Sequence, residues 1–255
     1  MPAEFILSDK LRVLLTNDDG IDSPGIKALQ EALKDRCDVY VLAPDSNRSA
    51  VSSHIVMNQP LSFKQYDSKT YACSGYPADC VIIALRSNLF GNVNFDAVIS
   101  GINKGPNMGT DCVYSGTVAA ARQAVLYGVP GIALSLKSKN DEYDYTELAA
   151  FAEKNLERLI SLSIPNLIVS VNAQCDKKSC GACLTTLCIR DYRDKVEIQN
   201  KNGVLQAVFC GGKIKTMGPE LNEYDAVKNG YIAVTRLYAE PVGYLDRDIK
   251  ADFEL

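Results

Sequence analysis

Apolar runs alternate with amphipathic segments along the first two thirds of this chain, and this alternation most limits the folds it can adopt. Runs typical of buried strands lie at residues 12–16, 39–43, 95–100, 132–136 and 167–171. Apolar residues recur at helical spacing within residues 23–33, 115–127 and 145–162. Strands and helices in this order predict an α/β fold with a doubly wound, mainly parallel sheet.

The pattern changes near residue 173, where short segments separated by Gly and Asn turns replace the strand and helix alternation. These segments lie at residues 184–190, 195–199 and 204–210, and they predict a β-hairpin extension followed by a helix at 223–228 and a strand at 231–237. We expect one domain over residues 1–255, in which 173–255 includes the extension and the C-terminal segment. An antiparallel extension cannot bury both faces alone, so we expect a homodimer or homotetramer.

Charge and hydropathy exclude several classes of partner. The 27 basic and 31 acidic side chains give a net charge of -4, whereas a nucleic-acid-binding protein usually has a basic surplus. The longest apolar stretches, such as residues 81–85 and 131–136, are too short to cross a bilayer. Residues 1–4 lack the features of a signal peptide. We therefore expect a cytoplasmic protein with neither a stable nucleic-acid partner nor a membrane partner.

The nine cysteines do not suggest a disulfide framework, because their number is odd and no export signal accompanies them. Four of them lie in or beside apolar segments, so we expect reduced and mostly buried thiols. The segment with Cys175, Cys180, Cys183 and Cys188 could bind zinc or form a redox pair. Its spacing matches no zinc module well, which favours a thiol-rich surface hairpin instead.

Two adjacent carboxylates, Asp18 and Asp19, directly follow the first apolar run and precede Gly20. In α/β proteins, ligands bind at the carboxyl ends of parallel strands. Like charges held side by side repel each other unless a cation offsets them, and oxygen ligands favour Mg²⁺ or Mn²⁺. A turn needs only one such side chain, so the pair predicts a divalent-metal site.

Two further polar loops follow strand ends, and we expect all three loops to meet at one edge of the sheet. The second loop contains Arg48 and Ser49, and the third contains Asn103 and Lys104. The third loop ends in Ser115-Gly116-Thr117, which opens a predicted helix. A helix start presents free N–H groups to an anion such as phosphate. The triplet taken alone is more typical of a simple helix cap, but a metal site across the cleft shifts the balance toward phosphate binding.

Three other residues each allow two interpretations, one functional and one structural. His54 is the only histidine and could act as a general acid, although a lone histidine is more often structural. Arg48 and Lys104 could neutralise substrate charge, although exposed basic residues are usually only solvated. One histidine is enough for a Ser-His-Asp triad, but the chain has no Gly-x-Ser-x-Gly elbow. A Walker A loop and a Gly-x-Gly-x-x-Gly strand–helix turn are also absent, which removes the main support for kinase and dehydrogenase activities.

Five motifs together resemble the stationary-phase survival protein (SurE) family of metal-dependent nucleotidases. The resemblance covers roughly residues 11–136 in order, and its motifs are residues 13–20, 43–45 with Ser49, 77–80, 100–103 and 114–121. It implies a Rossmann-like fold with a swapped C-terminal extension. Tyr76 stands where the family usually has Thr, which leaves the preferred nucleoside open.

The resemblance also implies an activity, a cofactor and site residues. The activity is hydrolysis of nucleoside 5′- and 3′-monophosphates to nucleoside and phosphate, with one divalent ion per subunit, Mg²⁺ or Mn²⁺. By position in the motifs, the metal ligands would be Asp18, Asp19, Ser49 and Asn103. Asn103, Ser115, Gly116 and Thr117 would contact the phosphate.

We expect metal-activated water to attack phosphorus in line, with Asp18 and Asp19 as the catalytic carboxylates. Attack by one carboxylate to give an aspartyl-phosphate is a variant of this mechanism. The rival hypothesis from another class is a nucleotide-sensing module that binds its ligand without turnover. A structural scaffold with a vestigial site is a third hypothesis, and the presence of all the proposed ligands disfavours it.

Overall fold

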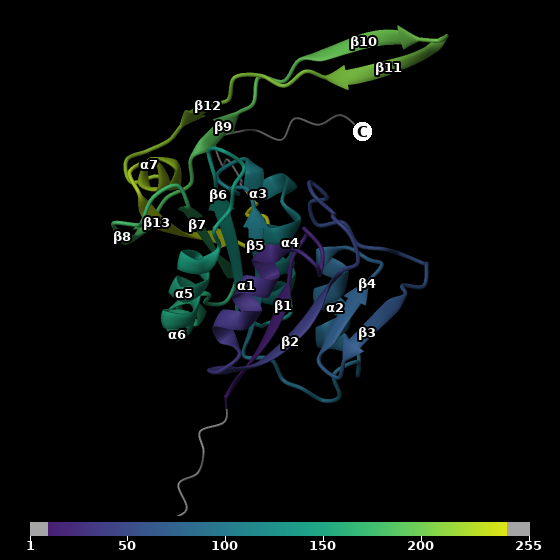
Figure 1. Ribbon diagram of the computed structural model, residues 1–255, viewed down its shortest axis with the longest axis vertical. Helices are drawn as coiled ribbons and strands as arrows, with labels where there is room; N and C mark the ends of the chain where they lie inside the picture. Colours follow the sequence, from purple (N-terminus) through teal and green to yellow (C-terminus); the bar gives the residue numbers. More distant parts are fainter. Residues whose placement is uncertain (1–9, 244–255) are drawn as a thin grey trace, which may run out of the picture.

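The computed structural model describes residues 10–243, so the expectations about residues 1–4 and the end of segment 173–255 lie outside the described residues. Nine strands form the main sheet: β1 (Leu11–Thr16), β2 (Cys37–Pro44), β3 (Phe63–Asp67), β4 (Thr70–Cys73), β5 (Ala97–Lys104), β6 (Gly131–Lys137), β7 (Leu167–Gln174), β8 (Gly181–Thr185) and β13 (Tyr231–Tyr238). Their order across the sheet is β3-β4-β2-β1-β5-β6-β7-β13-β8 (Figure 1).

The six central strands, from β4 to β7 in that order, are all parallel to one another. From β1 the chain proceeds outward through β2 to β4 and then returns to place β5 on the other side of β1. This reversal is a topological switch point, where the loops after two neighbouring strands diverge and leave a crevice for a ligand. The expected doubly wound, mainly parallel α/β sheet is confirmed.

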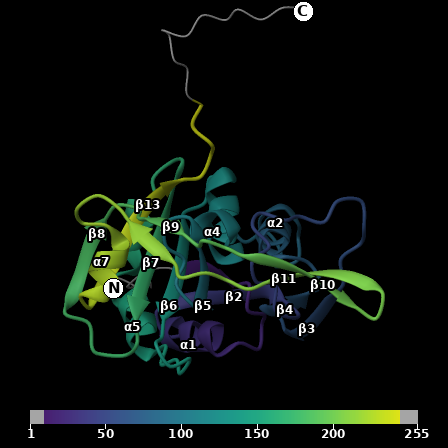
Figure 2. The same ribbon diagram turned by 90° about the horizontal axis from the view of Figure 1, so that it is seen from above.

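Helices cover both faces of the sheet (Figure 2). The helices are α1 (Pro24–Leu33), α2 (Pro77–Arg86), α3 (Asp111–Tyr114), α4 (Gly116–Leu126), α5 (Thr146–Lys154), α6 (Leu156–Leu162) and α7 (Glu223–Lys228). Val13 and Leu15 of β1 pack in the cluster that includes α1 and α5, whereas Leu14 packs in the cluster that includes α2 and α4. Both faces of β1 are therefore buried, which explains the uninterrupted apolar run of residues 13–15 within it.

Two predicted elements differ from the structure. The helix expected over 145–162 is two helices, because Asn155 leaves helical geometry and its Nδ2 donates to the carbonyl of Phe151 at 2.9 Å. The strand expected at 95–100 begins later and continues through Asn103, so this residue lies within β5.

The extension contains both a hairpin and an additional strand of the main sheet. The hairpin pairs β10 (Val196–Lys201) with β11 (Val204–Phe209) and extends away from the sheet and its helices (Figure 1). The expected single strand at 184–190 is wrong. It is divided between β8, which runs parallel to β13, and β9 (Ile189–Asp191), which pairs with β12 (Lys215–Met217). Within residues 10–243, no helix has the length and apolar character needed to cross a bilayer.

The buried carboxyl group of Glu223 joins the extension to the rest of the fold. Its Oε1 accepts hydrogen bonds from the backbone N–H of Gly109 at 2.6 Å and of Cys188 at 3.4 Å. Its Oε2 accepts a hydrogen bond from the hydroxyl of Thr235 at 3.3 Å. Burial raises the pKa of Glu223 to about 7, although these hydrogen bonds oppose the shift.

We predict that Glu223 makes the folded protein less stable as pH rises through its titration range. Because the pKa is higher in the folded than in the unfolded chain, the folded state holds more protons between pH about 4.5 and about 7, and stability is lost over this interval. Glu223→Gln does not titrate, so it should remove up to about 3 kcal/mol of this pH-dependent loss in the free energy of unfolding. The side-chain carbonyl of Gln can still accept hydrogen bonds from both N–H groups. Urea unfolding between pH 5 and 8 measures the effect.

The exposed Glu220 provides the matched control. Glu220→Gln should retain the pH dependence of the original protein. An unchanged pH dependence in Glu223→Gln would contradict the raised pKa.

Candidate functional site

The turn after β1 is organised by Asn17, which leaves the two following carboxylates free for other contacts. Asn17 Oδ1 accepts the N–H of Gly20 at 3.2 Å, and its Nδ2 donates to the carbonyl of Gly20 at 2.9 Å and to Ser23 Oγ at 2.7 Å. Ser23 precedes α1 as expected, but its hydroxyl makes no capping hydrogen bond. The turn therefore uses the amide of Asn17 and neither Asp18 nor Asp19.

Asp18 lies against the N-terminus of α4. Thr117 donates two hydrogen bonds to its carboxylate, from Oγ1 to Oδ1 at 2.5 Å and from the backbone N–H to Oδ2 at 3.1 Å. A Cβ atom on Gly116 would lie 2.9 Å from Asp18 Cβ, so only glycine leaves room for this carboxylate. The positive end of the α4 dipole favours a negative charge at this position.

The surroundings of Asp18 make its charge costly in the absence of a counter-ion. Only 4% of the residue is exposed. Burial raises the pKa of Asp18 to about 6, and the charge of Asp19 raises it as well, while the hydrogen bonds from Thr117 lower it. Burial also raises the pKa of Asp19, opposed by the backbone N–H of Lys104. A cation near both carboxylates would favour their charged forms.

The other two candidate metal ligands reach this region from different elements. Asn103, in β5, donates from Nδ2 to the carbonyl of Gly105 at 2.9 Å, which leaves its side-chain carbonyl as the acceptor it can offer. Ser49, in the loop after β2, is held by Asn47, whose Oδ1 accepts from the Ser49 backbone N–H at 2.8 Å and from its hydroxyl at 2.7 Å. The backbone N–H of Lys104 donates to Asp19 Oδ2 at 2.8 Å, which joins the ends of β1 and β5.

A cavity of about 240 Å³ opens where these loops meet. Four of the predicted site residues line it, namely Asp18, Ser49, Asn103 and Ser115. The other lining residues are Ala50, Lys104, Gly105, Pro106, Asn107, Asp111, Tyr114 and Tyr192. The cavity therefore lies at the carboxyl ends of β1 and β5, which is the switch point of the sheet.

Ser115-Gly116-Thr117 caps α4, whereas its contact with a phosphate stays a prediction. Ser115 is the N-cap of α4, and its Oγ accepts the backbone N–H of Val118 at 3.1 Å. A hydroxyl that accepts one hydrogen bond can still donate its proton, so Ser115 can also contact an anion in the cavity. Thr117 differs from the expectation, because its hydroxyl and N–H both bind Asp18 and its role here is to hold that carboxylate.

The basic residues and the single histidine have partners outside the cavity. Arg48 Nη2 donates to Asp45 Oδ1 at 3.1 Å, and Lys104 Nζ lies 3.1 Å from Asp141 Oδ2. The ring of His54 lies against that of Tyr76, with 4.1 Å between centroids, and is exposed. His54 is not one of the described residues that line the cavity.

The donors around the cavity fit a hard divalent cation. Asp18, Ser49 and Asn103 line the cavity and can supply carboxylate, hydroxyl and amide oxygens, whereas Asp19, Gly116 and Thr117 are not among the described residues that line it. The carboxylate of Asp19 is held next to the cavity by the backbone N–H of Lys104, a lining residue. Within residues 10–243, no group of three or more His, Cys, Asp or Glu side chains is arranged to hold a metal ion. An ion at this site would therefore need hydroxyl, amide or water oxygens to complete its coordination, as Mg²⁺ commonly does.

Sequence reasoning did not select Asp111 and Tyr192, although both line the cavity. Asp111 stands four residues before Ser115 on the same loop, and a search of that loop for acidic residues could have found it. Tyr192 follows β9 in the extension and is 77 residues beyond Ser115 (192 − 115). No local pattern connects it with the switch point, because its position depends on how the extension packs.

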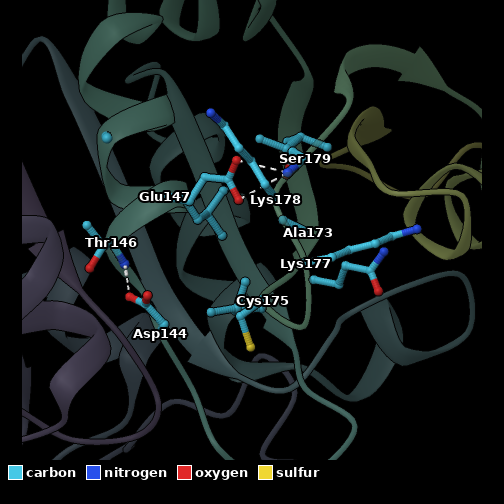
Figure 3. A pocket seen from close by; sticks show the side chains of 13 residues that line it. Asp144, Thr146, Glu147, Ala173, Cys175, Lys177, Lys178 and Ser179 are labelled. Carbon is cyan, nitrogen blue, oxygen red and sulfur yellow. Dashed lines mark hydrogen bonds between the residues drawn. The ribbon is translucent and has the colours of Figure 1, made fainter.

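A larger cavity of about 410 Å³ lies between α5 and the segment that joins β7 to β8 (Figure 3). Its lining includes Cys175, Lys177 and Ser179, and the backbone N–H of Ser179 donates to Glu147 Oε1 at 3.0 Å. None of the predicted site residues is among the described residues that line it. Its position beside α5 separates it from the switch-point residues.

The cysteines of the 175–188 segment occupy different environments. Cys175 and Cys183 are partly buried, Cys180 is exposed, and Cys188 is buried against Glu223. The segment is not the surface hairpin that was expected, because β8 pairs with β13 in the main sheet. All nine cysteines are free thiols, and the four expected in apolar surroundings, Cys37, Cys73, Cys80 and Cys112, are buried.

Comparison with known proteins agrees with this arrangement. The family model described as "Survival protein SurE" matches residues 13–194. The chain belongs to the SurE family. The 5′-nucleotidase SurE of Treponema pallidum is 44% identical over 187 residues, which cover 71% of this chain and 100% of that protein. The 5′-nucleotidase SurE of Geobacter metallireducens is 36% identical over 240 residues, covering 92% and 94% of the two chains.

A solved SurE structure shares the fold. The crystal structure of the SurE protein from Aquifex aeolicus superposes with a TM-score of 0.78 and 33% sequence identity, and the match covers 91% of this chain and 95% of that one. The family model spans the SurE motifs at the switch point and continues into β9 and Tyr192. The start of the extension is thus part of the SurE match.

We predict that Thr117 keeps the pKa of Asp18 from rising further. Thr117→Val keeps the shape of the side chain but removes the hydroxyl donor, so the pKa of Asp18 should rise by about one unit. NMR titration of ¹³C-labelled aspartate in the metal-free protein measures this pKa, with Asp18→Asn to assign the signal. Thr117→Ser retains the hydroxyl and should keep the original value, whereas an unchanged pKa in Thr117→Val would show that the contact has no such effect.

Proposed function

We propose that this protein is a metal-dependent nucleotidase that hydrolyses nucleoside 5′- and 3′-monophosphates to nucleoside and phosphate. The observation that carries the proposal is the cavity at the switch point, where Asp18, Ser49, Asn103 and Ser115 meet. Relatives that cover more than nine tenths of this chain are named 5′-nucleotidase SurE, which supports the same activity.

Asp18, Asp19, Ser49 and Asn103 would hold one Mg²⁺ or Mn²⁺ ion per subunit. The raised pKa values of both carboxylates support this assignment, because binding of a cation would offset their mutual repulsion. When bound, a divalent ion supplies positive charge that lowers the pKa of water and stabilises negative charge on phosphoryl oxygens. The two carboxylates determine where this charge is located.

The residues at the start of α4 would hold the phosphate. Ser115 can donate its hydroxyl proton, and the N-terminal end of α4 carries positive dipole charge that favours an anion. The side-chain amide of Asn103 lies at the same cavity and can orient a phosphoryl oxygen. Thr117 acts through Asp18, and His54 has no part in this proposal because it does not line the cavity.

Water attacks phosphorus and gives up a proton, the bond between phosphorus and the nucleoside oxygen breaks, and the leaving oxygen takes up a proton from solvent to give the nucleoside. The residues of the cavity hold the phosphoryl group so that the attacking and leaving oxygens are in line. Donors already in place around the equatorial oxygens stabilise the developing charge without further reorganisation.

The hairpin supports a homo-oligomer, either a dimer or a tetramer. By register, one face of the β10–β11 pair is mostly apolar and carries Val196, Ile198, Asn200, Leu205, Ala207 and Phe209. The other face is more polar and carries Glu197, Gln199, Lys201, Val204, Gln206 and Val208. On the apolar face, Ile198 is 68% exposed and Phe209 is 76% exposed. A two-stranded sheet with one exposed apolar face gains stability when a partner covers that face.

We include in the proposal that the chain is one domain and acts in the cytoplasm.

We predict phosphate release from AMP or GMP when Mn²⁺ or Mg²⁺ is added, and loss of this activity with EDTA. Asp19→Asn should lower kcat/KM by about 100-fold or more, because it removes a charge from the candidate ion site. Asp22→Asn, on an exposed residue of the same turn, is the matched control and should retain full activity. If the nucleotides bind but no phosphate is released under any of these conditions, the protein is a sensor and not an enzyme.

We predict that the apolar face of the hairpin holds the subunits together. The double change Ile198→Asp with Phe209→Asp should reduce the mass measured by light scattering to that of a smaller species, because it would bury charge at the interface. Gln206→Asp alters the opposite face and should not change the mass. An equal mass for all three proteins would mean that the subunits associate elsewhere.

A further inference from the structure

The first strand of the small β9–β12 pair docks on the loop that precedes α3. Gly109 approaches this segment so closely that a Cβ atom on it would lie 2.2 Å from the carbonyl oxygen of Cys188. The backbone N–H of Arg190 donates to Thr110 Oγ1 at 3.0 Å. Tyr192, two residues further along, lines the cavity at the switch point. The extension thus supplies one wall of the candidate active site.

Asp111 places a second carboxylate, after that of Asp18, in the lining of this cavity, beside the position proposed for the phosphate. It is buried, with 7% exposed, and its Oδ2 accepts the backbone N–H of Met108 at 3.1 Å. The carbonyl of Asp111 accepts the backbone N–H of Ser115, the cap of α4, at 3.0 Å. An uncompensated negative charge here would repel a phosphate dianion.

Two side chains of the extension interact with this carboxylate. The Tyr192 hydroxyl donates a short hydrogen bond to Asp111 Oδ1. Burial, together with Asp111, raises the pKa of Tyr192 to about 12, so the phenol remains a proton donor at neutral pH. Arg190 Nε lies 3.2 Å from the same oxygen without the alignment of a hydrogen bond, so the contact is an attraction between charges.

Arg190 contacts Asp111 without lining the cavity. Its side chain is only 11% exposed, and it is not among the described residues that line the cavity. Its guanidinium carbon lies 5.7 Å from the centre of the Tyr192 ring. A buried cation with this position can offset the charge of Asp111 without touching a ligand in the cavity.

We propose that Arg190 and Tyr192 are positioning residues that neutralise and hold Asp111, so that the cavity can accept a phosphate dianion. This inference rests on the proposed nucleotidase function. It assigns the extension a role in substrate binding that is separate from holding subunits together, and it makes the phosphate affinity depend on the pairing of Asp111 with Arg190.

The test measures KM for AMP and the inhibition constant of inorganic phosphate at pH 8. Arg190→Met should raise both constants by about tenfold or more, because the carboxylate becomes uncompensated, while kcat changes less. Tyr192→Phe should raise them less, because Arg190 remains. Arg190→Lys keeps the charge and should stay near the original values. Circular dichroism and thermal unfolding confirm that each variant is folded.

The double variant Arg190→Met with Asp111→Asn distinguishes this role from others. Removing both charges should return KM and the phosphate inhibition constant toward their original values, which a structural role or a direct contact between Arg190 and phosphate would not do. Asp111→Asn alone should lower the phosphate inhibition constant. The control is Arg193→Met, which removes a cation that pairs with Asp191 on the exposed side of the same segment and should leave both constants unchanged.

Three results would overturn the inference. The first is an unchanged KM in Arg190→Met, the second is a double variant as impaired as Arg190→Met, and the third is loss of metal-dependent activity in Asp111→Asn, which would identify Asp111 as a metal ligand. Each of these three results counts against the inference only if the original protein releases phosphate. If the original protein shows no hydrolysis with any nucleotide and metal, the proposed function itself is wrong.

Discussion

The carboxylate of Asp18 accepts two hydrogen bonds from Thr117 across 99 positions of sequence, and this contact ties the end of β1 to the start of α4. Gly116 makes the approach possible, because a Cβ at this position would collide with Asp18. The cavity forms between these two elements and β5. If Asp18 were displaced, the candidate metal site and the candidate phosphate site would lose their common boundary.

The same contact sets an electrostatic requirement for the whole site. Burial and the neighbouring Asp19 make the charged form of Asp18 costly, and Asp111 adds another carboxylate to the cavity. A site with this charge could not accept an anion unless cations offset it. A divalent ion would do so for Asp18 and Asp19, and Arg190 does so for Asp111. The activity we propose therefore depends on the balance of charges as much as on the individual ligands.

Much of the fold was predictable because local patterns reflect burial on both faces of a parallel sheet. Strands such as β1 contain uninterrupted apolar runs, and the turns after them are marked by Gly, Pro and short polar residues. The extension was harder to predict. Its first part was expected to be a hairpin, yet β8 joins the main sheet beside β13, whose sequence lies about 50 residues further on. Pairing between such distant segments leaves no periodic signal in either of them.

For the site, the sequence alone determined which oxygen-bearing residues stand at strand ends and at the start of a helix: Asp18, Asp19, Ser49, Asn103 and Ser115. Strand ends in a parallel sheet converge, so local order was enough to group them. Only the tertiary structure decided that Thr117 holds Asp18, that His54 lies outside the cavity, and that Tyr192 and Arg190 reach Asp111 from the extension. These contacts form only when segments far apart in the chain pack together. The sequence of either segment, taken alone, therefore does not specify them.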